Sequence, residues 1–140
     1  MTKLTEFFEG MAKAFNTGTL QDLKTILKLP TAVHIDTQVI VIKDAAQGLF
    51  VLNTFRDNLI RSDFDRVTFT MSDAEELRGG ATKVIVEWVA LSSSGVELTK
   101  ADATYICDYS QELGWQISII EFGRAKTTEQ GQFLGGLPLV

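Results

Sequence analysis

The feature that most constrains this chain is a long β-type stretch, Arg66 to Phe122, which three turn signals divide into strands. At its start, Val67, Phe69 and Met71 alternate with polar residues, which is the period of a strand. The turn signals are Arg78-Gly79-Gly80, Ser92-Ser93-Ser94-Gly95 and Gln111-Glu112-Leu113-Gly114. Because short turns join antiparallel neighbours, the stretch predicts a meander of four long strands.

Apolar residues occur on both faces of several of these strands. Val84, Val86 and Trp88 share one face, and Ile85 and Val89 share the other. A sheet with one solvated face would alternate more cleanly between apolar and polar residues. We therefore expect one face to pack on helices and the outer face to form a homodimer with a second copy of the chain.

Three helical patterns precede the sheet. The first has apolar residues at spacings of three and four, on one helix face: Leu4, Phe8, Met11 and Phe15. The second begins at Thr19, which can cap it, and ends at Pro30, which disfavours helical geometry in the residue before it. The third begins at Asp44, with Gln47 in the capping-box position, and runs to about Ser62. Between the second and third helices, two short runs rich in Val and Ile predict a hairpin: Thr31 to Ile35 and Val39 to Ile42.

The composition excludes several classes of function. Apolar residues make up 45% of the 140 residues, which suits one globular domain with a core. The net charge of −5 opposes a nucleic-acid partner, because such partners require a cationic face. No apolar run approaches the ~20 residues of a membrane span, and no signal peptide is visible. We therefore expect a cytoplasmic protein without a membrane partner.

Metal and cofactor sites are also not expected. Cys107 is the single cysteine and lies in an apolar β run, which is typical of a buried, inert thiol. His34 is the single histidine, so no histidine pair exists, and no carboxylates have the spacing of metal ligands. No glycine-rich loop follows a strand and opens a helix, as a nucleotide fingerprint would require.

The order of these elements resembles that of the nuclear transport factor 2-like superfamily, which includes ketosteroid isomerases, SnoaL-type polyketide cyclases and scytalone dehydratase. The first of three segments that carry the resemblance is Phe15-Asn16-Thr17-Gly18-Thr19, where such proteins usually show aromatic-Asn-x-Gly-Asp. The others are the capped helix Asp44 to Ser62 and the closing segment Gly114-Trp115-Gln116-Ile117. The resemblance covers Thr2 to about Phe122, so we expect one domain over residues 1–123 and a separate tail over 124–140.

The resemblance implies an α+β fold in which a cone-shaped, curved antiparallel sheet packs on three N-terminal helices. Such a sheet encloses an apolar cavity for a small organic molecule. The aromatic and sulfur-containing side chains expected to line the cavity are Phe8, Met11, Phe15, Phe55, Trp88 and Trp115. The tail has the apolar residues Phe133, Leu134, Leu137, Leu139 and Val140, and we expect it to be ordered and to pack on a partner subunit or at the lip of the cavity.

The resemblance to ketosteroid isomerases also suggests catalytic positions. It places Asp36 at the general base and Asp102 at the carboxylic acid that is kept protonated by an apolar site. The position of the tyrosine donor falls on Met11, which cannot donate a hydrogen bond. Half of the oxyanion hole is therefore missing.

Each candidate catalytic residue has a structural alternative. Asp36 is also typical of a hairpin turn. Asp102 lies between alanines in a strand, where Asp is disfavoured, so it either faces the cavity or is a surface charge. His34, the single histidine, is a natural candidate for a general acid or base, but it alternates with Val33 and Ile35 and so points to the other face.

Two functions remain open from the sequence. The favoured one is a binding or interaction module with an apolar cavity, because no convergent acid–base set is visible. The alternative is a cofactor-independent isomerase, cyclase or dehydratase that transfers protons through Asp102, His34 or Asp36.

Overall fold

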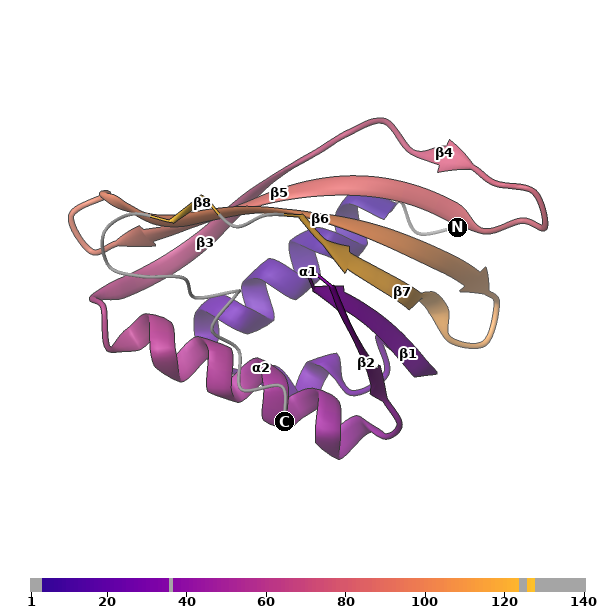
Figure 1. Cartoon of the computed structure of the whole chain (residues 1–140), viewed down its shortest axis with the longest axis horizontal. Coiled ribbons are helices and arrows are strands. Elements are labelled where there is room, and N and C mark those ends of the chain that lie inside the picture. The colour runs from indigo at the N-terminus through magenta and orange to yellow at the C-terminus, as the bar shows by residue number, and fades with distance from the viewer. Residues whose placement is uncertain (1–3, 36, 124–125, 128–140) are drawn as a thin grey trace.

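The computed structural model describes residues 4–35, 37–123 and 126–127. Within these residues, a curved eight-stranded sheet has both α-helices on one side (Figure 1). The helices are α1 (Leu4–Thr17), the 3-10 helix η1 (Leu20–Leu23) and α2 (Ala45–Ile60). The strands are β1 (Leu27–Ile35), β2 (Gln38–Ile42), β3 (Phe64–Met71), β4 (Glu75–Glu76), β5 (Thr82–Ser92), β6 (Glu97–Ser110), β7 (Gly114–Phe122) and β8 (Lys126–Thr127). The predicted α+β class is confirmed.

The sheet has the strand order β2-β1-β7-β6-β5-β3, with β4 paired to β5 and β8 paired to β6. The predicted meander is confirmed as β3, β5, β6 and β7, each antiparallel to its neighbour. The sheet is mixed and departs from the predicted antiparallel arrangement in one ladder, because β1 pairs with β7 in parallel. Parallel pairing requires a crossover, and here α2 and the meander lie between the two strands in the chain.

The first and third predicted helices are confirmed as α1 and α2. On α1 the apolar face is buried, and Phe8 is inaccessible to solvent. Asp44 caps α2, since its Oδ1 accepts a hydrogen bond from the Gln47 backbone N–H at 2.8 Å. The Gln47 side chain in turn accepts a hydrogen bond from the Lys43 backbone N–H at 2.9 Å. These two bonds satisfy N–H groups that have no partner within the helix.

The second predicted helix is wrong beyond its first turn. The short helix η1 buries Leu20 and Leu23, and Thr19 makes no side-chain cap. The chain then continues toward β1, because its backbone finds a partner on β7: Ile26 O accepts a hydrogen bond from Ile117 N at 2.6 Å. Pairing in a packed sheet overrides a local helix preference. The three predicted helices therefore become two α-helices and one short 3-10 turn.

Pro30 lies within β1 and does not end a helix. The register between β1 and β7 shifts between Leu27 and Ala32, and the pairing with β2 begins at Thr31. Proline has no N–H to donate to a ladder, so it is tolerated at such an irregularity. The predicted hairpin that follows is confirmed by the antiparallel β1–β2 ladder.

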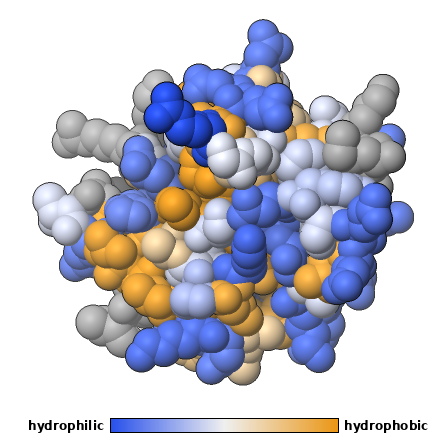
Figure 2. All heavy atoms as spheres, turned by 90° about the vertical axis from the view of Figure 1, so that its right-hand side faces the viewer, coloured by the Kyte–Doolittle hydropathy of each residue, from blue (hydrophilic) through white to orange (hydrophobic). Residues whose placement is uncertain are grey.

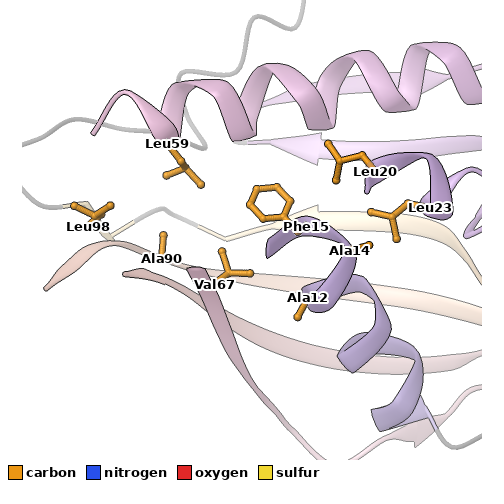
Figure 3. Packing of buried hydrophobic residues seen from close by; sticks show 9 residues of the cluster. All are labelled: Ala12, Ala14, Phe15, Leu20, Leu23, Leu59, Val67, Ala90 and Leu98. Carbon is orange, nitrogen blue, oxygen red and sulfur yellow. The ribbon is translucent and has the colours of Figure 1, made fainter. Parts of the chain in front are cut away.

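The main core lies between the helices and the face of the sheet that they cover. On β6, Ala101, Ala103 and Cys107 are buried on this inner face, while Lys100 and Thr104 lie on the outer face and are only partly buried. Figure 3 shows one cluster of this core, between α2, α1 and the sheet. Its buried members are Ala12, Ala14, Phe15, Leu20, Leu23, Leu59, Val67, Ala90 and Leu98.

The outer surface mixes polar and apolar regions, as one end of the molecule shows (Figure 2). No helix in the described ranges combines the length and apolar character needed to cross a bilayer. Of the predicted tail, only β8 and its backbone pairing with β6 are described. The expected packing of Phe133 to Val140 lies outside the described residues.

Candidate functional site

A divided apolar cavity lies between the helices and the inner face of the sheet. Its first part has a volume of about 110 Å³ and is lined by α1, η1, α2 and strands β3, β5, β6 and β7. Its second part has a volume of about 100 Å³ and is lined mainly by α2, β1, β2 and β7. The two parts adjoin, because five residues line both: Met11, Leu52, Phe55, Tyr105 and Phe122.

Small side chains on two neighbouring strands create the first part. Ala90 on β5 pairs with Thr99 on β6, and Trp88 pairs with Ala101. Three of these four inward positions therefore carry a small side chain, which leaves space between the sheet and the helices. The large side chains Phe15 and Phe55 line the opposite wall of this space.

The Tyr105 hydroxyl is the first of two hydroxyl groups that the described residues place at the cavity. Tyr105 is only 4% exposed, and its Oη accepts a hydrogen bond from Trp88 Nε1 at 2.8 Å. Burial raises the pKa of the Tyr105 hydroxyl far above its ordinary value, the bond from Trp88 opposes this rise, and the neighbouring Cys107 adds to it. The hydroxyl therefore keeps its proton at neutral pH.

The Thr99 hydroxyl is the second of these hydroxyl groups. Thr99 is 3% exposed and lines the first part of the cavity. Its Oγ1 is buried and has no hydrogen-bond partner among the described residues. Buried hydroxyls in native proteins are normally paired, so this unpaired oxygen requires an explanation.

A more polar hollow on the surface adjoins the cavity between α1 and η1. It has a volume of about 340 Å³, and its wall includes Lys13, Thr17 and Asp22. Met11 and Leu23 line both this hollow and the first part of the cavity. Since methionine is unbranched and adapts its shape easily, this wall is a candidate entrance.

Four of the six side chains expected to line the cavity do so: Met11, Phe15, Phe55 and Trp88. Phe8 packs against the Tyr105 ring, with ring centroids 4.9 Å apart, and belongs to the solid core. Trp115 stacks edge-on with Tyr109 near the β6–β7 turn. Neither Phe8 nor Trp115 is among the residues that line the two parts.

Asp102 and His34 are two of the three residues expected to transfer protons, and the structure describes the position of both. Asp102 lies on the outer face of β6, directly opposite Glu87 of β5. His34 alternates with the buried residues Val33 and Ile35, so it also points outward, beside Glu121 of β7. The structure brings neither side chain into the cavity. Asp36, the third candidate, lies outside the described residues.

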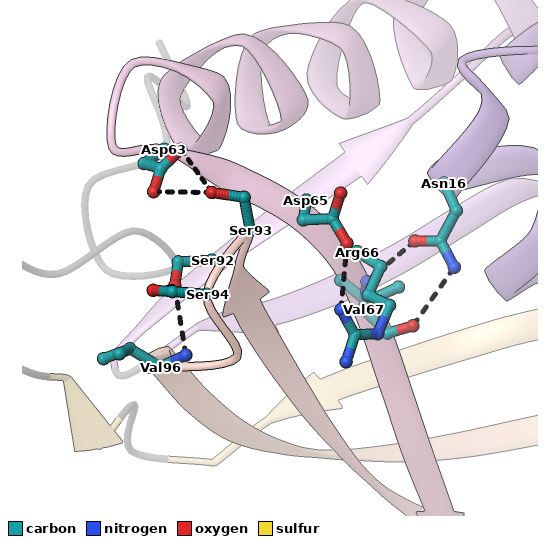
Figure 4. Close-up of polar contacts among 9 residues, drawn as sticks. All are labelled: Asn16, Asp63, Asp65, Arg66, Val67, Ser92, Ser93, Ser94 and Val96. Carbon is teal, nitrogen blue, oxygen red and sulfur yellow. Dashed lines mark hydrogen bonds and ion pairs between the residues drawn. The ribbon is translucent and has the colours of Figure 1, made fainter.

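The segment that carries the family resemblance has a structural role at the end of α1. The Asn16 side chain makes two bonds to Val67 of β3: Oδ1 accepts from the backbone N–H at 2.7 Å, and Nδ2 donates to the carbonyl at 3.2 Å (Figure 4). Arg56 of α2 donates to the carbonyls of Phe15 at 2.6 Å and Asn16 at 3.2 Å. Gly18 has a φ of +79°, and a Cβ there would lie 3.3 Å from the Arg56 guanidinium. The segment therefore joins α1, α2 and β3 around the cavity.

Reasoning from the sequence did not assign Tyr105 and Thr99 to the site. Alternation along β6 places Tyr105 on one face with Ala101 and Cys107, but it does not tell which face is covered by helices. Thr99 shares that face. The run of small residues around Ala101 is the signal that indicates the space in front of them. Within the described ranges, no group of three His, Cys, Asp or Glu side chains is placed to hold a metal ion.

Comparisons with known proteins agree with the fold. The family model described as "NTF2-like protein (DUF6841)" matches residues 2–124. No match is found among curated proteins.

Solved structures with the same fold are similar in shape but distant in sequence. ActVI-ORFA from Streptomyces coelicolor has a TM-score of 0.70 at 7% identity, over 86% of this chain and 90% of that chain. An NTF-2 like protein of unknown function from Shewanella oneidensis MR-1 has a TM-score of 0.64 at 13% identity, over 85% of this chain and 94% of that chain. A protein from Catenulispora acidiphila, in complex with S-DNPA, has a TM-score of 0.62 at 8% identity, over 85% of this chain and 90% of that chain. At these identities the likeness shows the fold alone.

Proposed function

The chain belongs to this family of NTF2-like proteins, and on that premise we propose that it binds a small, uncharged, largely apolar organic molecule in the divided cavity. The observation that carries the proposal is the lining. Every described residue that lines the two parts is uncharged, and nearly all are aliphatic or aromatic. A charged ligand would lose its hydration there without gaining a charged partner, at a cost on the order of several kcal/mol. An apolar ligand would gain from burial.

The size of the cavity sets the size of the ligand. An apolar void of about 150 Å³ is enough to bind benzene. The two adjoining parts, of about 110 Å³ and 100 Å³, suit a molecule of one or two rings. The complex of the Catenulispora acidiphila protein with S-DNPA supports the proposal, because it is a case of this fold with a bound ligand.

Binding without turnover is the function that we favour over proton-transfer catalysis. A general base must lie within hydrogen-bond reach of the proton that it abstracts. Among the residues that the structure describes, the polar side chains at the cavity are the hydroxyls of Tyr105 and Thr99 and the indole of Trp88, and none of these is a base at neutral pH. An isomerase, cyclase or dehydratase acting through Asp102 or His34 would have to hold its substrate on the outer face of the sheet.

A cavity-filling variant tests the proposed function. We expect Ala101→Leu to abolish binding, because the larger side chain would occupy the first part of the cavity where Ala101 faces it. The measurement is a thermal-shift screen of neutral one- and two-ring compounds, followed by titration with the tryptophan fluorescence of Trp88 as the signal. Ala74→Leu, at an exposed position, is the matched control and should bind as the unaltered protein does. Binding that survives in Ala101→Leu would place the ligand elsewhere.

We also propose that the outer face of the sheet forms a homodimer. Ile106, Ile119 and Ala32 lie side by side in one row across β6, β7 and β1. Ile119 is 38% exposed and Ile85 on the same face is 44% exposed, so apolar surface is accessible between the polar side chains. Sedimentation should give a dimer at micromolar concentration. Ile119→Lys should produce a monomer, and Val96→Lys in the β5–β6 turn should not.

A further inference from the structure

We propose that the ligand of the cavity is an uncharged molecule that carries oxygen acceptors, which the Tyr105 and Thr99 hydroxyls bind as hydrogen-bond donors. This inference rests on the proposed function and names the chemical class of its ligand. Ketones, esters and cyclic ethers on a one- or two-ring skeleton belong to that class.

The direction of the Trp88–Tyr105 bond fixes the role that remains for Tyr105. An indole N–H can only donate, so in this bond the Tyr105 oxygen accepts, at 2.8 Å. The phenolic proton of Tyr105 is therefore not used in this bond, and no acceptor for it is found in the part of the chain that the structure describes. Tyr105 lines both parts of the cavity, so its free donor is available to a ligand in either.

The bond also removes Trp88 from the set of ligand donors. Its Nε1–H is occupied by Tyr105, so Trp88 contributes its apolar ring to the wall of the cavity. The same bond holds the Tyr105 side chain in place before a ligand arrives. A donor that is already held in position loses little side-chain entropy on binding.

Thr99 provides an independent observation. It lies on the same face of β6 as Tyr105, and only Ala101 and Ala103 separate the two along that face. Its buried Oγ1 has no partner among the described residues, although it lines the first part of the cavity. A ligand oxygen there would satisfy this hydroxyl. The two hydroxyls therefore mark two polar positions along one strand, with apolar surface between them.

The absence of charge on the lining separates this ligand class from acids and amines. A carboxylate or an ammonium group would need a charged partner in such a site, and the described lining residues supply none. Burial keeps the Tyr105 hydroxyl protonated, so it remains a donor across the physiological pH range. A neutral carbonyl or ether oxygen is the acceptor that matches these donors.

The first test uses pairs of compounds that share a carbon skeleton and differ by one carbonyl group. The pairs are indane with 1-indanone, tetralin with 1-tetralone, and ethylbenzene with acetophenone. Dissociation constants are measured by tryptophan fluorescence or NMR titration for the unaltered protein and for Tyr105→Phe. We expect Tyr105→Phe to weaken the ketones by about tenfold relative to their hydrocarbons, which is the effect of one buried hydrogen bond.

The outcomes separate the two levels of the proposal. If both members of each pair bind and Tyr105→Phe changes their dissociation constants by the same factor, the inference that the ligand carries an oxygen acceptor is overturned. The proposed binding of apolar molecules then still stands. If the unaltered protein binds neither member of any pair at the solubility limit, the proposed function itself is overturned.

A second variant tests Thr99 and does not depend on Tyr105. Thr99→Val keeps the shape of the side chain and removes the hydroxyl. We expect it to raise the melting temperature of the free protein, because a buried unpaired oxygen is lost. We also expect it to abolish any preference for 4-chromanone, which has a second ring oxygen, over 1-tetralone. A lower melting temperature together with an unchanged preference would show that the hydroxyl has a structural role, and would overturn its place in the ligand site.

Discussion

The two faces of β6 carry different kinds of polar group. The inner face has the neutral hydroxyls of Thr99 and Tyr105 among alanines and Cys107, all buried. The outer face has the charged side chains of Lys100 and Asp102, which are partly exposed. Successive side chains of this part of β6 therefore point alternately to a neutral interior and to a surface that carries charges. Charge is tolerated where water reaches it, and only uncharged groups are found where water is excluded.

The difference between the two faces of β6 also decides where chemistry can occur. Asp102 is the residue that the sequence makes conspicuous, because Asp is unusual between alanines in a strand. Its place on the outer face gives a simpler reason for its presence. The Asp102 side chain is partly accessible to solvent, and the two flanking alanines are the residues that face the interior. The conspicuous residue is thus on the surface, and the less conspicuous Tyr105 is at the cavity.

The largest expected effect comes from moving a carboxylate from the outer face of β6 to the inner face. Ala103 is fully buried next to Asp102. We expect Ala103→Asp to lower the free energy of unfolding by about 4 kcal/mol or more, because an unpaired charge would be buried. Urea denaturation measures this value. Thr104→Asp on the outer face is the control, with a change below about 1 kcal/mol. Similar values for the two variants would show that the faces are assigned incorrectly.

Alkaline pH probes the inner face without a change of sequence. Burial, with a smaller contribution from the negative charge of Asp108, raises the pKa of the Cys107 thiol from 9.0 to about 12. The unfolded chain can then ionise this thiol above pH 9, while the folded chain cannot. The stabilisation is complete below pH 9 and is lost as pH rises toward 12, and we expect a decrease of about 1 kcal/mol per pH unit.

Cys107→Ala isolates the contribution of this thiol to the decrease in the free energy of unfolding at alkaline pH. Without the thiol, unfolding free energies measured by urea titration between pH 8 and 11 should decrease less steeply. The Tyr105 hydroxyl, whose pKa burial also raises, should still cause a decrease at the upper end of this range. Identical slopes for the two proteins would contradict the buried position of the thiol.

The Trp88–Tyr105 bond gives the next smaller effect on stability. Tyr105→Phe would leave the Trp88 N–H buried without an acceptor, and we expect it to lower the free energy of unfolding by about 2 kcal/mol. Tyr109→Phe, at a position that is 37% exposed, is the matched control with little change. Because the expected loss comes from the indole, Tyr105→Phe combined with Trp88→Phe should lose less than the sum of the single variants.

A variant on the outer face of β6 should have the smallest effect on the free energy of unfolding. Asp102 lies directly across from Glu87, and like charges in such a pair are destabilising. We expect Asp102→Asn to raise the free energy of unfolding by about 0.5 kcal/mol at low salt, and by less at high salt. Glu87→Gln should gain less, because Lys100 Nζ lies 3.9 Å from the Glu87 carboxylate and compensates its charge. A loss of stability in Asp102→Asn would indicate that the carboxylate has an unrecognised partner.

Much of the fold follows from local pattern in the sequence. The cap at Asp44, the apolar stripe that contains Phe8, and the turns of the meander are each determined by residues close together in the chain. The segment after Leu23 could not be predicted in the same way. The helix predicted to run from Thr19 to Pro30 is overridden there by the backbone partner that the segment finds at Ile117, far along the chain.

The candidate site was predictable only in its apolar part. Bulky residues on helical stripes, such as Met11 and Phe15, face the core of almost any arrangement of these elements, and here they line the cavity. The polar part depends on which face of β6 the helices cover. Period-two alternation leaves that choice open, and Asp102 and Tyr105 exchange roles according to it.

The parallel ladder between β1 and β7 has a consequence for the order in which this protein is made and folded. β1 and β2 emerge early during synthesis, but the edge of β1 that pairs with β7 has no neighbour until the last long strand has been translated. An unpaired strand edge is a template for association with other chains, and contacts between distant segments form slowly. Nascent chains that end before Gly114 should therefore be the species most dependent on chaperones, and the second part of the cavity closes only when β7 is in place.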